Sequence, residues 1–227
     1  MSIHQIKVQP LTQKAFSQYG TCIDLPAEGD YELRSSDRFD FYPKLCTYTC
    51  DSNVFQIGIS TLYERPFRTV NMERHYHTQE LMVPLTNPII IVFSKNKGMD
   101  YSEEPDIETA EAFLITPQQG VVVDTGVWHW TPMPVGGDSR IICSFAENTS
   151  ATDVDVRKFP AGEVLEVLLG SWRAFVCQDY LKSAPPLPWE PLTVHPSPFQ
   201  LPIIRRLQIG LNITVLIPWR SISALPK

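Results

Sequence analysis

Short apolar segments rich in Val, Ile and Phe recur between about residues 54 and 146, and this pattern most limits the possible folds. Clusters of Gly, Pro, Asn or Asp separate them, as is typical of strands joined by turns. Several short strands at regular spacing predict a β-sandwich or β-barrel rather than alternating βαβ units. The chain is therefore expected to be mainly β, with strands in VFQIGIS, LMVPL, PIIIVFS, AFLIT, GVVVDT and RIICSFA.

A helix is expected on either side of this region. LTQKAFSQYG has helical spacing, with Thr12 as the N-cap and Gly20 as the C-terminal stop. A second helix is predicted over residues 161–182, because apolar residues repeat there at helical intervals after a Pro. The stretch that follows is Pro-rich and reads as an extended linker or tail. We therefore expect one domain over residues 1–184 and a Pro-rich tail over residues 185–227, whose last apolar segment is compatible with a strand pair or a partner-binding element.

The composition narrows the class of protein. A chain of 227 residues is long enough for one domain with a well-buried core. Charged residues make up 19% and apolar residues 43%, which indicates a globular rather than a disordered chain. The formal net charge is −6 and the basic residues are dispersed, so nucleic-acid binding is not expected.

The cysteines and the N-terminus indicate a cytoplasmic protein. Five cysteines are an odd number, and Cys46 and Cys50 have no second Cys or His pair nearby that would complete a zinc ribbon. Reduced thiols in an intracellular protein are the better interpretation. The N-terminal segment has no apolar signal core. The longest apolar stretch, LQIGLNITVLIP, is too short to span a bilayer, so no membrane association is expected.

Groups that bind metals or move protons gather in ERHYHTQE, residues 73–80. In a strand, Glu73, His75 and His77 share one face, while Arg74 points the other way. A β-barrel that turns this face inward can bring it together with a His from another strand. GVVVDTGVWHW supplies His129, which lies between two Trp residues in a hydrophobic environment where a neutral imidazole ligand or base is plausible.

The spacing matches small barrels of the cupin type. Such barrels carry two inward ligands two residues apart, a carboxylate five residues later, and a His after a Gly-x-x-His turn on a distant strand. Here Glu73-x-His75, Glu80 and Gly126-Val-Trp-His129 occupy these places. Two His with one or two carboxylates suit Zn, Mn, Fe or Ni. The alternatives are a solvated polar hairpin for residues 73–80 and a core imidazole for His129.

The sequence resembles the ureidoglycolate lyase family, a cupin family of purine (allantoin) catabolism. The similarity runs through VQPLTQKAFSQYG, ERHYHTQELMVPL and AFLITPQQGVVVDTGVWHW and covers about residues 6–160. The matched triplets are Glu73-Arg74-His75, Gln119-Gly120-Val121 and Val127-Trp128-His129.

Several residues depart from the family pattern. The family usually has Gln where this chain has Glu80, and Asn-Tyr-His where it has Val122, Val123 and Asp124. A second His often follows the Trp-His pair, and here that position is Trp130. These departures bear on the substrate more than on the fold. Asp124 is itself interpreted as a turn former rather than as a catalytic acid.

The resemblance implies cleavage of (S)-ureidoglycolate to glyoxylate and urea. It implies a base, an acid, a cation for the substrate carboxylate, and a divalent metal ion such as Ni, Zn or Mn. The candidate catalytic residues are Glu73, His75 and His129, the substrate-binding residues are Arg74, Gln119 and Trp128, and the metal ligands are His75, Glu80, His129 and His77.

Alternatives to these assignments stay open. Arg74 is either a carboxylate clamp or a salt-bridge partner on the outer face. The chain is alternatively a diverged metal-dependent cupin enzyme acting on another small hydroxy acid, or a non-catalytic cupin that binds a small carboxylate or only dimerises. Barrels of this kind commonly pair through sheet edges and terminal segments, so a homodimer is expected.

Overall fold

The computed structural model describes residues 2–24, 32–97, 104–160, 162–170, 172, 207–209 and 213–215. The chain divides into two units, Met1–Ser183 and Ala184–Lys227. In the second unit, β17 (Leu207–Ile209) and β18 (Ile213–Val215) form an antiparallel pair. Among the residues described, no helix is both long enough and apolar enough to cross a bilayer.

The larger sheet of the first unit has nine strands. Strand β13 (Met133–Pro134) lies beside β9. The order of the others is β15 (Asp155–Lys158), β7 (Asn71–Arg74), β12 (Trp128–His129), β9 (Ile89–Ser94), β10 (Glu111–Ile115), β1 (Ser2–Pro10), β16 (Glu163–Leu168) and β6 (Arg68–Thr69).

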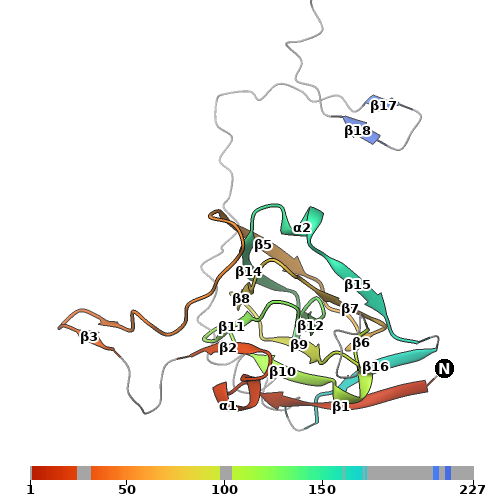
Figure 1. Cartoon of the computed structure of the whole chain (residues 1–227), viewed down its shortest axis with the longest axis horizontal. Coiled ribbons are helices and arrows are strands. Elements are labelled where there is room, and N and C mark those ends of the chain that lie inside the picture. Colours follow the sequence, from red (N-terminus) through yellow and green to blue (C-terminus); the bar gives the residue numbers. More distant parts are fainter. Residues whose placement is uncertain are drawn as a thin grey trace, which may run out of the picture. The chain divides into compact units, whose positions relative to one another are not determined.

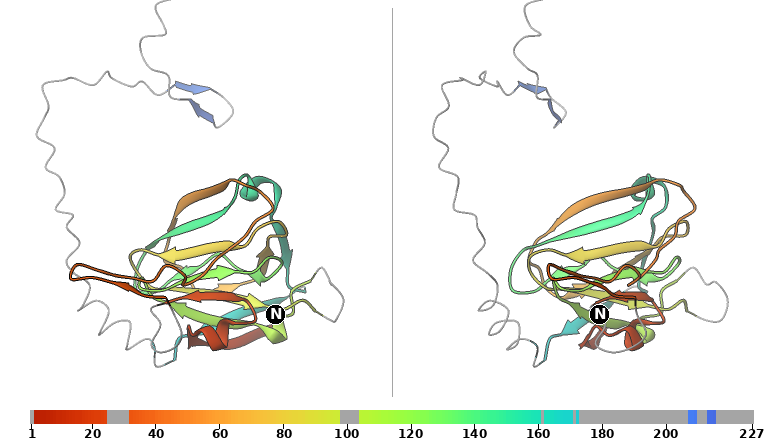
Figure 2. Two further views of the ribbon diagram at one scale, coloured as in Figure 1. Left: turned by 60° about the vertical axis from the view of Figure 1, so that its left-hand side comes forward. Right: turned by 90° about the vertical axis from the view of Figure 1, so that its left-hand side faces the viewer.

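The smaller sheet has five strands, and the two sheets enclose a common interior (Figures 1 and 2). Its order is β2 (Gly20–Ile23), β11 (Gly120–Val123), β8 (Glu80–Pro84), β14 (Ser139–Ala146) and β5 (Phe55–Leu62). A short pair, β3 (Arg34–Ser35) with β4 (Asp40–Phe41), lies outside both sheets. The mainly β fold predicted from the sequence is confirmed.

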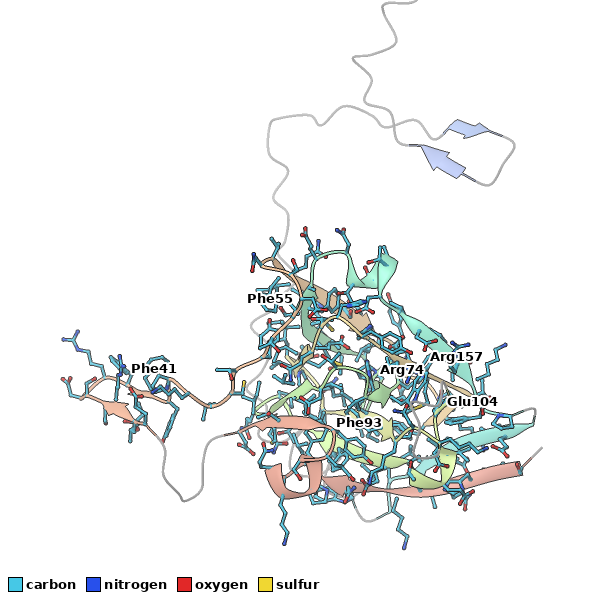
Figure 3. The ribbon with its side chains drawn as sticks, viewed as in Figure 1. Phe41, Phe55, Arg74, Phe93, Glu104 and Arg157 are labelled. Atoms are coloured by element: carbon cyan, nitrogen blue, oxygen red, sulfur yellow. The ribbon has the colours of Figure 1, made fainter. Side chains whose placement is uncertain are left out.

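Strand β9 shows how the core is divided between the two faces of the larger sheet. Ile89, Ile91 and Phe93 pack between the sheets, where they meet apolar residues of β8, β11 and β14. The intervening Ile90 and Val92 pack into a second cluster on the opposite face. All five are fully buried, which is why this strand reads as a continuous apolar run. Phe93 lies inside the barrel in Figure 3.

The predicted N-terminal helix is present as one turn, α1 (Gln13–Phe16), and it ends at Phe16 with Ser17 as the C-cap, not at Gly20 as predicted. The Thr12 side chain accepts a hydrogen bond from the Ala15 amide, which confirms it as the N-cap. Gly20 begins strand β2 at a φ of 146°, and a Cβ there would lie 2.0 Å from the Val122 carbonyl oxygen. The close approach of β11 therefore requires Gly at this position. Two further short helices are η1 (Ile107–Thr109) and α2 (Thr149–Thr152).

The helix predicted over residues 161–182 was wrong for Glu163–Leu168, which forms strand β16. This strand pairs in parallel with β1, from Ser2 opposite Glu163 to Lys7 opposite Leu168. The β-branched residues Val164 and Val167 are buried, and pairing with β1 outweighs the helical spacing of the leucines. Most of the remaining stretch lies outside the described residues.

Candidate active site

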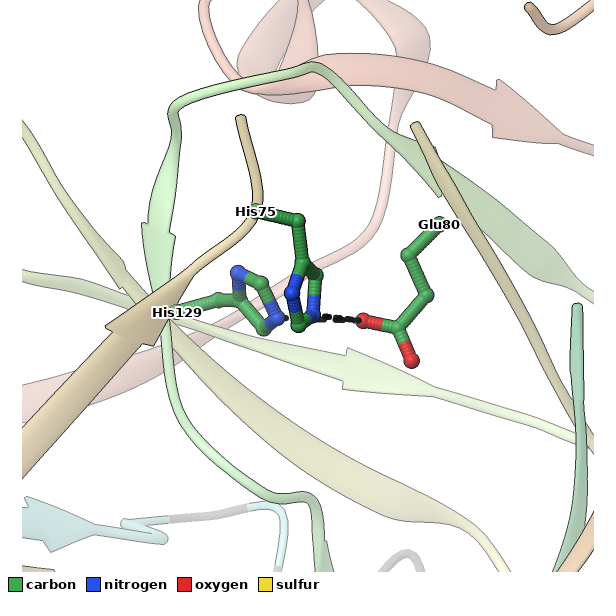
Figure 4. Close-up of side chains that lie close together, drawn as sticks. All are labelled: His75, Glu80 and His129. Carbon is green, nitrogen blue, oxygen red and sulfur yellow. Dashed lines mark hydrogen bonds and ion pairs between the residues drawn. The ribbon is translucent and has the colours of Figure 1, made fainter. Parts of the chain in front are cut away.

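Side chains from three separate elements converge inside the barrel: His75 follows β7, Glu80 begins β8, and His129 ends β12 (Figure 4). The Nε2 atoms of His129 and His75 lie 3.1 Å and 3.4 Å from Oε2 of Glu80. One potential ligand atom from each residue lies within 4.8 Å of the others, and all three residues are buried. We call these residues the His-Glu-His cluster.

Strand register explains why the cluster forms. His129 is the direct cross-strand partner of Glu73 on one side and of Phe93 on the other. All three therefore face the space between the sheets, and His75 continues on the face of Glu73 because side chains alternate along a strand. Gly126, at a φ of 78°, donates its amide to the His75 carbonyl and turns the chain into β12.

Backbone carbonyls set the orientation of both imidazoles. His75 Nδ1 lies 2.6 Å from the Asp153 carbonyl oxygen, and His129 Nδ1 lies 3.0 Å from that of Val127. A carbonyl oxygen only accepts, so each Nδ1 carries a hydrogen, and Nε2 faces Glu80 with a lone pair in the neutral ring or with an N–H in the protonated ring. Imidazoles that bind metals are held in this way.

Glu80 needs a positive partner inside the barrel. Burial raises the pKa of this carboxyl, but hydrogen bonds from His129 and His75 outweigh that effect and lower it to about 2. Burial conversely lowers the pKa of His75, while the hydrogen bond and charge of Glu80 raise it to about 9. A buried carboxylate facing two Nε2 atoms is thus stabilised either by a proton on an imidazole or by a cation among the three groups.

The cluster lies on a cavity of about 580 Å³. Glu73 also lines this cavity and is half-buried. Burial is the largest influence on Glu73 and raises its pKa; the negative charge of Glu80 acts in the same direction, while His129 and His75 oppose it. A carboxyl group with a raised pKa beside two imidazoles is suited to accepting and returning a proton.

Arg74 faces away from the cavity. Its Nη2 lies 3.1 Å from Oδ2 of Asp155, and its Nη1 donates to Oδ1 of Asn96 at 3.0 Å. The guanidinium also stacks over the Trp128 ring, 4.1 Å from the ring centre, and the Trp128 indole donates to the same Asn96 oxygen. Of the two alternatives for Arg74, the structure shows the salt bridge. Neither Arg74 nor Trp128 lines the cavity.

The structure places two further candidate residues outside the cavity. Gln119 donates to Oδ2 of Asp24 at 2.7 Å and borders a separate, smaller depression. His77 is exposed, and its Nδ1 lies 2.9 Å from Oδ2 of Asp51. His77 is not part of the His-Glu-His cluster.

The departures from the family pattern also lie mostly outside the cavity. Val122 and Val123 are buried in β11. Asp124 accepts a hydrogen bond from Gln79, and Trp130 packs against the core cluster on the outer face of the larger sheet. Glu80 is the departure that reaches the cavity.

Sequence reasoning missed Arg65. This residue lies on the connection between β5 and β6, and it lines the cavity. Its Nη2 donates to the backbone carbonyls of Thr131 and Pro132 at 2.8 Å and 2.9 Å. Arg65 belongs to no motif. The one sequence feature that could have indicated its role is that it lies eight residues before Glu73, shortly before the strand that carries Glu73.

Comparisons with known proteins agree with this structure. The model of the family described as "Ureidoglycolate lyase" matches residues 3–167. A ureidoglycolate lyase of Mesorhizobium japonicum is 27% identical over 136 residues, which are 58% of this chain and 80% of that protein. One of Pseudomonas aeruginosa is 30% identical over 129 residues, which are 55% of this chain and 73% of that protein.

The chain is also similar to a solved rmlC epimerase of Mycobacterium tuberculosis. The TM-score is 0.37 and the identity 12%, over 58% of this chain and 66% of that one. This likeness is too weak to support a conclusion on function. The family match includes all three residues of the His-Glu-His cluster and most of the strands of the two sheets. The chain belongs to the ureidoglycolate lyase family.

Proposed function

We propose that the protein is a ureidoglycolate lyase, which cleaves (S)-ureidoglycolate to glyoxylate and urea. The observation that carries the proposal is a cavity, in a member of this family, that brings Glu73 together with the His-Glu-His cluster. A diverged enzyme acting on another hydroxy acid is less well supported, because four of the five departures from the family pattern lie outside this cavity.

The substrate determines what the cavity must do. Ureidoglycolate carries a hydroxyl, a carboxylate and a ureido nitrogen on one carbon. Cleavage removes the hydroxyl proton, forms the aldehyde C=O bond, and breaks the C–N bond with its electron pair going to nitrogen. The leaving nitrogen takes up one proton, so the reaction moves a proton from oxygen to nitrogen without net consumption.

Glu73 is the proposed proton carrier. Its carboxylate takes the hydroxyl proton and returns it to the nitrogen of the departing urea. Because burial raises the pKa of this group, both its protonated and its ionised form are accessible closer to neutral pH than for a solvated carboxyl. The half-buried position of Glu73 also limits exchange of the proton with bulk water.

The His-Glu-His cluster fits a divalent metal ion. Two imidazole nitrogens with Nδ1 held by backbone carbonyls, together with one carboxylate, form a donor set suited to Ni, Zn or Mn. An ion held by these three residues would supply positive charge that favours loss of the substrate hydroxyl proton.

A homodimer is proposed to form through β5. This strand ends the five-stranded sheet, and FQIGISTL contains no charged residue and no Pro to block edge pairing. Phe55, Ile57 and Ile59 are exposed there, the last two at 76% and 67%. Antiparallel pairing with β5 of a second copy would bury this apolar row. The cytoplasmic location stays a prediction.

The experiment is to measure urea release from (S)-ureidoglycolate by the full chain and by Glu73→Gln. Gln keeps the size of the side chain but cannot carry the proton, so a loss of roughly a hundredfold or more is expected. Glu108→Gln, which alters an exposed carboxylate paired with His4, is the matched control and should keep full activity. Equal activity of both variants would contradict the role of Glu73.

A further inference from the structure

The charges around the cavity raise a problem for an anionic substrate. Two carboxylates, Glu73 and Glu80, face the cavity and would repel a substrate carboxylate. The ion proposed for the His-Glu-His cluster is assigned to the substrate hydroxyl, so the substrate carboxylate calls for a second cation. The predicted clamp, Arg74, is committed to Asp155 on the other face of the sheet. Among the described residues that line the cavity, Arg65 is the single Lys or Arg.

We propose that Arg65 is the carboxylate-binding residue of this cavity and selects small α-hydroxy acids as ligands. This inference rests on the proposed function, because it deepens that function by assigning the substrate carboxylate to a residue. The ligand chemistry is an α-hydroxycarboxylate whose carboxylate meets the guanidinium while its hydroxyl points to Glu73.

The hydrogen bonds of Arg65 leave part of its guanidinium available to a ligand. A guanidinium has five N–H donors, and the two recorded bonds, to Thr131 and Pro132, both come from Nη2. These partners are neutral carbonyls. Within the described part of the chain, no carboxylate lies within 4.0 Å of Arg65 to neutralise its charge. Burial lowers the pKa of Arg65, as expected for a cation partly removed from water.

The tether to Thr131 places Arg65 beside the reacting groups. Thr131 is two residues after His129, lines the cavity together with Glu73, and its side chain acts on the Glu73 carboxyl to lower its pKa. One short segment therefore holds Arg65 through its backbone carbonyls and carries His129, the cross-strand partner of Glu73. The carboxylate and the hydroxyl of an α-hydroxy acid are on adjacent carbons, so their binding groups must be neighbours. Planar guanidinium groups bind carboxylates through paired hydrogen bonds.

The test measures binding separately from turnover. Glycolate contains the carboxylate and hydroxyl of the substrate, and glycolamide replaces the carboxylate by a neutral amide of similar shape. Titration calorimetry with the full chain should show glycolate binding more tightly than glycolamide. In Arg65→Gln this preference should fall by roughly tenfold or more, the scale for losing a charge-assisted hydrogen bond. Arg65→Lys should recover part of it, because the charge remains but the planar fork does not.

Arg68→Gln is the matched control. Arg68 lies three residues further along, pairs with Glu166 at the surface and does not line the cavity, so its glycolate preference should match the parent. In turnover, Arg65→Gln should raise KM for ureidoglycolate more than it lowers kcat.

The outcomes separate this inference from the proposed function. A folded Arg65→Gln protein that still prefers glycolate would overturn the inference, leaving Arg65 only a tether for Thr131 and Pro132. A parent protein that releases no urea contradicts the proposed lyase, yet loss of the glycolate preference in Arg65→Gln would still support the anion site.

Discussion

Removing the charge of Asp155 should destabilise the protein by about 2 kcal/mol at pH 7. Asp155 accepts from both Nε and Nη2 of Arg74, whose side chain is only 3% exposed. Breaking a buried ion pair costs about 3–5 kcal/mol, because the remaining charge is left without compensation. Asp155→Asn keeps one acceptor oxygen, and the Trp128 ring still covers the guanidinium, so a cost of about 2 kcal/mol, below this range, is expected.

Urea denaturation of Asp155→Asn and of the control Asp51→Asn checks this prediction. Asp51 pairs with His77 at the surface, where both side chains are more than two-thirds exposed, and its loss should change stability by less than about 0.5 kcal/mol. Equal effects of the two substitutions would refute the reasoning, because they would show that the burial of Arg74 does not matter.

The pH dependence supplies a second check. Burial raises the pKa of Asp155, but hydrogen bonds from Tyr76 and Arg74 and the charge of Arg157 outweigh that effect and lower it. A lowered folded pKa means that the stabilisation is complete above the unfolded value of about 3.9 and is lost as pH falls through the folded pKa. The difference between parent and Asp155→Asn should therefore shrink in acid. A difference that grows as pH falls would contradict this.

Three further predictions concern the site and the assembly. His129→Ala should lower the rate of urea release by roughly a hundredfold or more, whereas Glu80→Gln, which restores the family's usual residue, should keep much of that rate. Steady-state assays measure both rates, and circular dichroism checks that each variant is folded. Equal, small effects of the two substitutions would contradict the role of the cavity. A chain that ends at Ala184 should keep a cooperative thermal melt, because both large sheets of the described structure end by Leu168, and an aggregating product would contradict the predicted domain boundary. Ile57→Lys should convert a dimer to a monomer in sedimentation velocity, and a parent that sediments as a monomer would contradict pairing through β5.

The His-Glu-His cluster was predictable because its information is local. Glu73 and His75 share a face through the two-residue period of a strand, and Gly126 marks the turn that brings His129 to them. The outward direction of Arg74 follows from the same period. The strand period could not decide whether Arg74 is a carboxylate clamp or a salt-bridge partner. That depends on Asp155, which lies far along the chain and reaches Arg74 only through pairing of β15 with β7.

Strand β16 and the position of Arg65 in the cavity could not be predicted from the sequence, because both depend on contacts between residues far apart in the chain. The apolar spacing around Leu165 is compatible with both a helix and a strand, and the parallel pairing of β16 with β1 selects the strand. Arg65 lies on a connection without regular structure, and its place in the cavity depends on hydrogen bonds to carbonyls 66 and 67 residues away. Such contacts become visible only when both sheets are assembled.

The central claim is that this cavity cleaves ureidoglycolate, and quantifying both products from the purified full-length chain tests it most directly. With (S)-ureidoglycolate as substrate, the account predicts equal amounts of urea and glyoxylate. Removal of divalent metal with a chelator should abolish the release, and Glu73→Gln should reduce it roughly a hundredfold or more. A metal-loaded, folded protein that releases neither product from this substrate would contradict the account.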